Sequence, residues 1–285
     1  MTLPTPLIQA NALLALRGTA GWPVVLDCGF DLFDTGAGHA AYLQAHLPGA
    51  HYAHLDHDLS GPKTERGSID GGRHPLPARE AFAATLAGWG IGPDTPVVAY
   101  DAQGGPYAAR AWWLLRWMGH TAVAVLDGGP QSWLAAGGPV ESGPAQKPAS
   151  QAAYPLRAPG MPTVHAAGLW QGLGRLAVLD ARAGERFRGE VEPLDARAGH
   201  IPGARHRFFK DNLAADGRFL DAAALREAFE GFGQAPEEVV HQCGSGVTAC
   251  HNLLAMEAAG LPGSVLYPGS WSEWSSDPTR PVAIG

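Results

Sequence analysis

The fold of this chain is decided by the stretch Val239-Val240-His241-Gln242-Cys243-Gly244-Ser245-Gly246-Val247-Thr248-Ala249-Cys250-His251-Asn252. Its beginning predicts a buried strand, and the apolar residues that follow it predict a helix. Cys243 stands between the two, and its glycine neighbours let the backbone turn tightly around a side chain. Backbone N–H groups and the positive end of the helix dipole at such a junction favour a thiolate over a thiol. The pattern therefore predicts that Cys243 is a reactive nucleophile.

Composition limits the other functions this chain could have. Its 285 residues, 46% of them hydrophobic and 16% charged, are enough for about two domains with substantial cores. The net charge of −7, with no basic block, argues against a nucleic-acid partner. The sequence has no signal segment and no apolar run of about 18 residues, so we expect neither secretion nor membrane insertion.

The three cysteines are sparse and do not cluster as metal ligands do: Cys28, Cys243 and Cys250. They indicate free thiols in a reducing compartment, and we expect a soluble cytoplasmic protein without metal or cofactor. Cys28 at a strand end and Cys250 on the helix are expected to be buried small side chains.

The two halves of the chain repeat the same order of motifs. A strand ending in Asp27 precedes the turn His46-Leu47-Pro48-Gly49, and a strand ending in Asp180 precedes His200-Ile201-Pro202-Gly203. The strand before Asp101 corresponds in the same way to the strand before Cys243. A repeat this long indicates two similar domains rather than a solenoid. We predict domains at 1–138 and 161–285, joined by a Pro- and Gly-rich linker at 139–160.

Each half alternates short apolar strands with helical stretches, which predicts an α/β fold with a mostly parallel sheet flanked by helices. Ligand sites in such sheets lie at the carboxyl ends of strands, where Cys243 falls. The first half carries Asp101 at the matching position, on a loop that looks about three residues longer before its helix. Because a carboxylate cannot replace a thiolate as the nucleophile, this half is expected to be catalytically silent.

Cys243 to Ala249 resembles the active-site loop of the rhodanese superfamily, in the form typical of 3-mercaptopyruvate sulfurtransferases. The resemblance extends to the tandem arrangement, to both His-x-Pro-Gly turns and to the stretch Gly269 to Trp274. It implies two rhodanese-like domains and sulfur transfer through a persulfide on Cys243. The donor would be a small molecule, and the acceptor a thiol, cyanide or a thioredoxin-like protein.

The resemblance also implies roles for several other residues. Ser245, His74 and Asp56 match a relay that would move the substrate's proton, whereas the simpler role for Ser245 and Thr248 is to cap the helix. The donor's anionic end would meet Arg186, since a guanidinium binds a carboxylate with two parallel hydrogen bonds. Arg197 stands closer to His200 than the family's second arginine does, and is the candidate for that role. The substrate-binding loop is completed by Gly244, Gly246, Val247 and Thr248.

Three alternatives compete with mercaptopyruvate transfer. A thiosulfate sulfurtransferase often carries Arg and Lys after the cysteine, where this chain has Gly244 and Ser245. A cysteine-dependent phosphatase needs an arginine six positions after the cysteine, where Ala249 stands. A non-enzymatic persulfide carrier would need no pocket lined by Arg186.

Overall fold

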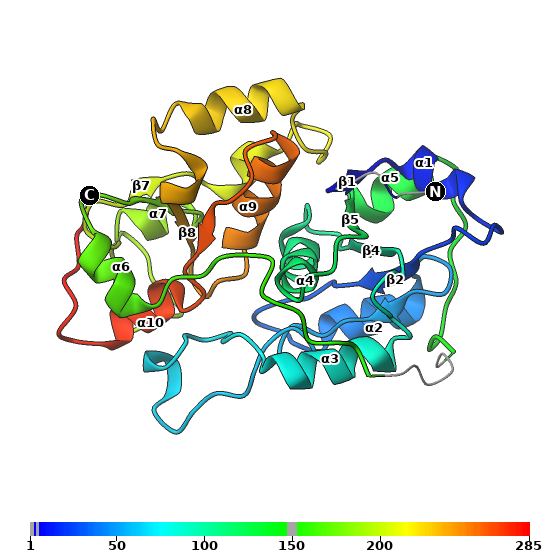
Figure 1. The fold of residues 1–285 in the computed structure, drawn as a ribbon, viewed down its shortest axis with the longest axis horizontal. Helices are drawn as coiled ribbons and strands as arrows, with labels where there is room; N and C mark the ends of the chain where they lie inside the picture. Colours follow the sequence, from blue (N-terminus) through cyan, green and yellow to red (C-terminus); the bar gives the residue numbers. More distant parts are fainter. Residues whose placement is uncertain (1–2, 4–5, 147–152) are drawn as a thin grey trace. The chain divides into compact units, whose positions relative to one another are not determined.

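The structure is a computed structural model that describes residue 3, residues 6–146 and residues 153–285 (Figure 1). The chain divides into two compact units. The first comprises the described parts of Met1–Leu59, Pro77–Gly160 and Ala215–Phe219, and the second comprises Ser60–Leu76, Met161–Ala214 and Leu220–Gly285. Each unit therefore includes a short segment from the other half of the sequence. Part of the predicted linker, residues 147–152, lies outside the described residues.

In the first unit the described residues form a five-stranded sheet in the order β1-β5-β4-β2-β3. Its strands are β1 (Leu7–Ile8), β2 (Val24–Asp27), β3 (His51–Tyr52), β4 (Val97–Tyr100) and β5 (Val123–Leu126). All the pairings are parallel. Every residue of β4 and β5 is buried, as expected for the middle of a parallel sheet covered on both faces. Its helices are α1 (Ala10–Ala15), α2 (Ala37–Gln44), α3 (Arg79–Gly88), α4 (Pro106–Trp117) and α5 (Gly129–Ala135).

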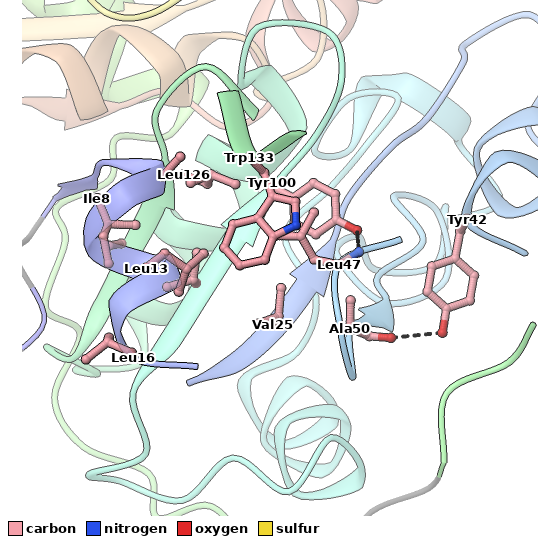
Figure 2. Close-up of a cluster of buried hydrophobic side chains, with 13 residues drawn as sticks. Ile8, Leu13, Leu16, Val25, Tyr42, Leu47, Ala50, Tyr100, Leu126 and Trp133 are labelled. Carbon is pink, nitrogen blue, oxygen red and sulfur yellow. Dashed lines mark hydrogen bonds between the residues drawn. The ribbon is translucent and has the colours of Figure 1, made fainter. Parts of the chain in front are cut away.

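One face of this sheet packs against α1, α2 and α5 in a single apolar cluster (Figure 2). Alternate residues of β4 contribute to it, because successive side chains of a strand point to opposite faces. Buried polar atoms in the cluster are paired: the Tyr42 hydroxyl donates to the Ala50 carbonyl, and the Leu47 N–H donates to the Tyr100 hydroxyl (Figure 2). The other face contacts α4, which carries the buried Trp112 and Trp113.

In the second unit the described residues form a four-stranded parallel sheet in the order β7-β6-β8-β9. Its strands are β6 (Ala177–Asp180), β7 (Arg205–His206), β8 (Val239–Gln242) and β9 (Val265–Leu266). Its helices are α6 (Ala166–Gly172), α7 (Gly184–Phe187), α8 (Ala222–Glu230), α9 (Ala249–Ala258) and α10 (Ser270–Ser276), with 3₁₀ turns η1 (Gly67–Ile69), η2 (Phe209–Asn212) and η3 (Pro236–Glu238). The order β7-β6-β8-β9 repeats the order β3-β2-β4-β5 of the first unit.

Helices cover both faces of the second sheet as well. Residues of α6 and α10, including Trp271 and Trp274, form one apolar cluster with Val178 and Val240. On the opposite face α9 contacts β8 and β9, and α8 contacts α9. The helix α9 ends where Gly260 adopts a φ of 71°, the left-handed conformation that commonly terminates a helix.

Residues 60–76, which we call the 60–76 segment, pack on the second unit although they lie in the first half of the sequence. The turn η1 in this segment contacts α10. The Arg73 N–H donates to Ser272 Oγ at 2.8 Å, and the Gly71 N–H donates to Glu273 Oε1 at 3.2 Å. Gly72 has a φ of 80°, and a Cβ there would lie 2.3 Å from the Gly269 carbonyl oxygen. Only glycine permits this close approach.

The two strand-to-helix loops differ less than the sequence suggested. The helix α4 begins at Pro106, five positions after Asp101, and α9 begins at Ala249, six positions after Cys243. The expectation of a longer first loop is therefore wrong. Across the described residues, no helix combines the length and the apolar character needed to cross a bilayer.

Candidate active site

Cys243 directly follows β8, which lies between β6 and β9 in the second sheet. The side chain is only 1% exposed, so the sulfur is shielded from bulk solvent. The loop from Cys243 to Thr248 then leads into α9. The structure thus places the predicted nucleophile at the carboxyl end of a central strand and before a helix N-terminus.

The start of α10 holds the backbone of this loop. The Trp271 N–H donates to the Cys243 carbonyl at 2.9 Å, and the Ser272 N–H donates to the Gly244 carbonyl at 2.8 Å. The Cys243 N–H in turn donates to Ser270 Oγ at 3.1 Å. Ser270 has a φ of 53°, a left-handed conformation that is costly for a residue with a Cβ. Strained residues of this kind are typical of functional sites. In the sequence, Ser270 could be noticed only because it lies in the motif from Gly269 to Trp274.

Gly246 is the turning point of the loop. Its φ is 76°, and an added Cβ would lie 2.3 Å from the Pro268 carbonyl oxygen. Val247 is buried, and its carbonyl accepts the Cys250 N–H at 3.0 Å. Thr248 precedes α9 but makes no side-chain capping hydrogen bond, so the helix-capping role considered for it is not observed.

Ser245 and His74 lie together although 171 positions separate them in the sequence. His74 Nδ1 is 2.7 Å from Ser245 Oγ, and both side chains are almost completely buried. His74 reaches Ser245 because the 60–76 segment belongs to the second unit. Asp56 belongs to the first unit, and its N–H donates to His54 Nδ1 at 3.1 Å.

Arg186 lies at the centre of a buried charge network. Its Nη2 donates to both carboxylate oxygens of Glu192, at 2.7 and 2.9 Å, and to Asp195 Oδ2 at 3.1 Å. Arg73, which the sequence interpretation did not single out, donates through Nη1 to Asp195 Oδ1. Burial raises the pKa of the Asp195 carboxyl, and the Arg73 guanidinium opposes that rise. One carboxylate therefore joins two arginines, with one oxygen for each.

Both guanidinium groups face the residue next to the nucleophile. A Cβ added to Gly244 would lie 3.3 Å from Arg186 Nη1 and 3.3 Å from Arg73 Nη2. The loop carries no charge of its own, yet two cationic groups lie beside it. The Gly-Arg-His sequence at 72–74 could have marked Arg73 only if the position of the 60–76 segment had been known.

Arg197 is committed elsewhere in the second unit. Its guanidinium donates to the carbonyls of four residues at and beyond the C-terminal end of α10: Trp274, Ser275, Asp277 and Arg280. A cation placed among the unpaired carbonyls of a helix end satisfies them and opposes the helix dipole. The structure therefore brings Arg73, rather than Arg197, beside Arg186.

The other two cysteines, Cys250 and Cys28, are buried as well. Cys250 is fully buried, and its thiol donates to the Gly246 carbonyl at 3.4 Å. Cys28 is also fully buried, and burial raises the pKa of its thiol well above the usual range. A thiol that stays protonated is a poor nucleophile.

Known proteins resemble this chain over most of its length. The sequence model of the rhodanese-like domain matches residues 10–136 and 165–277. The chain belongs to the rhodanese family. It is 49% identical over 271 residues to a Pseudomonas aeruginosa protein provisionally named 3-mercaptopyruvate sulfurtransferase, with 92% of each chain covered. It is 44% identical over 272 residues to a Mycobacterium tuberculosis protein, SseB, provisionally named thiosulfate sulfurtransferase, with 93% of each chain covered.

Solved structures of sulfurtransferases have the same fold as this chain. The 3-mercaptopyruvate sulfurtransferase from Leishmania major matches with a TM-score of 0.82 and 30% identity, over 95% of this chain and 74% of that one. The predicted fold class, two rhodanese domains with parallel sheets flanked by helices, is confirmed. The prediction of a rhodanese-family sulfurtransferase is confirmed as well.

In the first rhodanese domain, Asp101 stands at the position that corresponds to Cys243, at the start of the matching loop. The Asp101 carboxylate accepts four backbone N–H groups at 2.8–2.9 Å, from Gln103, Gly105, Tyr107 and Ala108. Burial raises the pKa of Asp101, and these backbone donors oppose the rise. A loop of this kind gathers N–H groups around one anionic side chain.

Proposed function

We propose that this protein transfers sulfur from 3-mercaptopyruvate, through a persulfide on Cys243, to a thiol, cyanide or a thioredoxin-like acceptor. The observation that carries the proposal is the position of Cys243, buried in a loop beside the Arg186 guanidinium. The Pseudomonas relative, which matches over nearly the whole chain, carries the mercaptopyruvate name. A guanidinium next to the nucleophile suits a short donor that has a carboxylate at one end and sulfur at the other.

In the first step the Cys243 thiolate attacks the sulfur of mercaptopyruvate. The S–S bond forms as the C–S bond breaks, and the electron pair moves to the carbon beside the ketone. The thiol proton of the donor ends on that carbon, which releases pyruvate and leaves an anionic persulfide. In the second step an acceptor nucleophile takes the outer sulfur and restores the thiolate. Two easier displacements replace one difficult transfer.

Backbone donors around Cys243 would stabilise the persulfide anion. Among the described residues, the N–H groups of Ser245, Val247, Thr248 and Ala249 have no hydrogen-bond acceptor. The corresponding loop of the first domain directs its N–H groups at the Asp101 carboxylate. Preorganised donors of this kind lower the free energy of a negative charge that forms during the reaction.

Ser245 and His74 would handle the proton of the donor thiol. With neutral His74 accepting at Nδ1, the Ser245 hydroxyl donates to the imidazole and can accept a proton from the substrate. The proton then returns to the carbon that becomes the methyl group of pyruvate. Asp56 remains a proposed third member of this relay. It belongs to the first unit, whereas Ser245 and His74 belong to the second.

Thiosulfate is the second candidate donor, because the Mycobacterium relative carries the thiosulfate sulfurtransferase name at 44% identity. Thiosulfate also has an anionic end that a guanidinium could bind. We favour mercaptopyruvate because the loop itself carries no charge after Cys243, whereas thiosulfate is a dianion. A reducing cytoplasm is the compartment we propose, which the three free cysteines support.

The test is a comparison of donors on the purified protein. Mercaptopyruvate should add one sulfur atom to Cys243 by mass spectrometry, with a kcat/KM above that for thiosulfate. Cys243→Ser should abolish the added mass, and Cys250→Ser should retain it. A kcat/KM for thiosulfate at least tenfold higher, or about 1.4 kcal/mol in transition-state stabilisation, would instead establish thiosulfate as the donor.

A further inference from the structure

The backbone of Arg73 is held firmly on the second unit. Its N–H donates to Ser272 Oγ, and the preceding Gly72 lies against the Gly269 carbonyl. Ser272 also donates its own N–H to the Gly244 carbonyl. Arg73 and the loop of the nucleophile are thus fixed to the same residue of α10.

The side chain of Arg73 is only partly used by the protein. Nη1 pairs with Asp195, whereas Nε is buried without a hydrogen-bond partner. Buried donors in native proteins nearly always have a partner, so an unpaired guanidinium N–H indicates that a ligand or water belongs there. Among the described residues, neither Arg73 Nη2 nor Arg186 Nη1 makes a hydrogen bond.

These two unused amino groups meet at one point, over Gly244. Asp195 sets their separation, because each of its oxygens binds one of the two arginines. Gly244 follows Cys243, and neighbouring Cα atoms are about 3.8 Å apart. An anion bound at this point is within reach of the thiolate for a donor only three carbons long.

We infer that Arg73 is the second cation of the donor site, and that Arg73 and Arg186 each bind one oxygen of the donor's carboxylate. The inference rests on the proposed function and assigns to Arg73 the role that the sequence interpretation offered to Arg197. The absence of a side chain on Gly244 is what leaves room for the anion. A larger residue there would press on both guanidinium groups.

The charges around this site refine which anion it accepts. The connected network holds three arginines and three carboxylates: Arg73, Arg182, Arg186, Asp180, Glu192 and Asp195. Its formal charge is zero, so the site offers directed hydrogen bonds rather than a strong positive field. Such a site suits a monoanionic carboxylate better than a dianion, whose second charge would not be compensated.

The experiment compares mercaptopyruvate with its methyl ester, which keeps the sulfur and the ketone but lacks the negative charge. Arg73→Met should lower kcat/KM for persulfide loading by the acid about 10- to 100-fold, as expected for losing a hydrogen bond to a charged group. Loading by the ester should hardly change. Arg73→Lys should recover only part of the loss, because an ammonium has a different donor geometry. Arg66→Met is the control, since Arg66 lies in the same segment with a 68% exposed side chain.

A second measurement does not depend on turnover. Pyruvate should bind the resting wild type, and Arg73→Met should weaken its calorimetric dissociation constant by a similar factor. Gly244→Ala should also weaken pyruvate binding, because its Cβ would press on both guanidinium groups. Equal losses with acid and ester, or unchanged pyruvate binding in Arg73→Met, would overturn the assignment.

The outcome also separates this inference from the proposed function. If the wild type uses thiosulfate and not mercaptopyruvate, the donor proposal fails. The role of Arg73 is then tested by measuring persulfide loading of Arg73→Met with thiosulfate and with a neutral organic trisulfide. A loss confined to thiosulfate supports the anion site, and an equal loss with both donors refutes it.

Discussion

Replacing Arg197 with methionine should unfold α10 more readily without changing donor recognition. The guanidinium donates to four backbone carbonyls, at 2.7–3.2 Å. Hydrogen bonds that involve a charged group contribute about 1.5–3 kcal/mol each, but bonds from one side chain are not independent. Water can also reach some of the freed carbonyls, since these bonds are only partly buried. We therefore expect a loss of about 2–4 kcal/mol in the free energy of unfolding.

Denaturant unfolding followed by tryptophan fluorescence would report this loss, because Trp271 and Trp274 lie on α10. The transition midpoint should fall in Arg197→Met and stay constant in Arg66→Met. KM for mercaptopyruvate, measured where both proteins are fully folded, should remain within about twofold of the wild type. An unchanged midpoint together with a KM raised tenfold or more would show that Arg197 binds the donor, and would refute the structural role.

Three further predictions follow from the loop and the 60–76 segment. Gly246→Ala should lower the free energy of unfolding, measured with denaturant, by about 1–3 kcal/mol. Gly233→Ala is its control, because Gly233 has a similar φ of 75° but a Cβ added there would have no atom within 4 Å. The control should lose less stability if the contact of the Gly246 Cβ with the Pro268 carbonyl matters. Ser245→Ala and His74→Ala should slow turnover of mercaptopyruvate more than that of thiosulfate, which brings no thiol proton; equal slowing in a steady-state assay would indicate loop support alone. Residues 161–285 expressed alone lack His74 and Arg73, so mercaptopyruvate turnover should be lost, and full activity would contradict the role given to the 60–76 segment.

The sequence was most informative where the fold is determined locally. The run Val239–Gln242 is apolar enough to predict a buried strand, and the small residues after it predict a tight loop. Cys243 could be placed because strand, loop and helix follow one another along the chain. Asp101 could be matched to it for the same reason.

The residues that lie beside the Cys243 loop were harder to find because their positions depend on tertiary structure. Nothing in the periodicity of residues 60–76 indicates that they pack on α10, since most of the segment is irregular. Arg73 was therefore missed, and His74 could be named only through a family resemblance. Arg197 looked like a substrate residue because the carbonyls it binds belong to residues about 80 positions away, as the separations of 77 to 83 show. Backbone acceptors leave no mark in a sequence.

The 60–76 segment packs on the second unit, whereas the residues on either side of it belong to the first. Its first end follows Leu59, whose carbonyl accepts the buried Arg110 guanidinium of α4 at 3.2–3.3 Å. Its last end leads through Pro77 into α3. Both ends are thus attached to elements of the first domain, so docking the segment on α10 is intramolecular. A tether of this length corresponds to an effective concentration on the order of mM. A free peptide of the same sequence would lack that advantage.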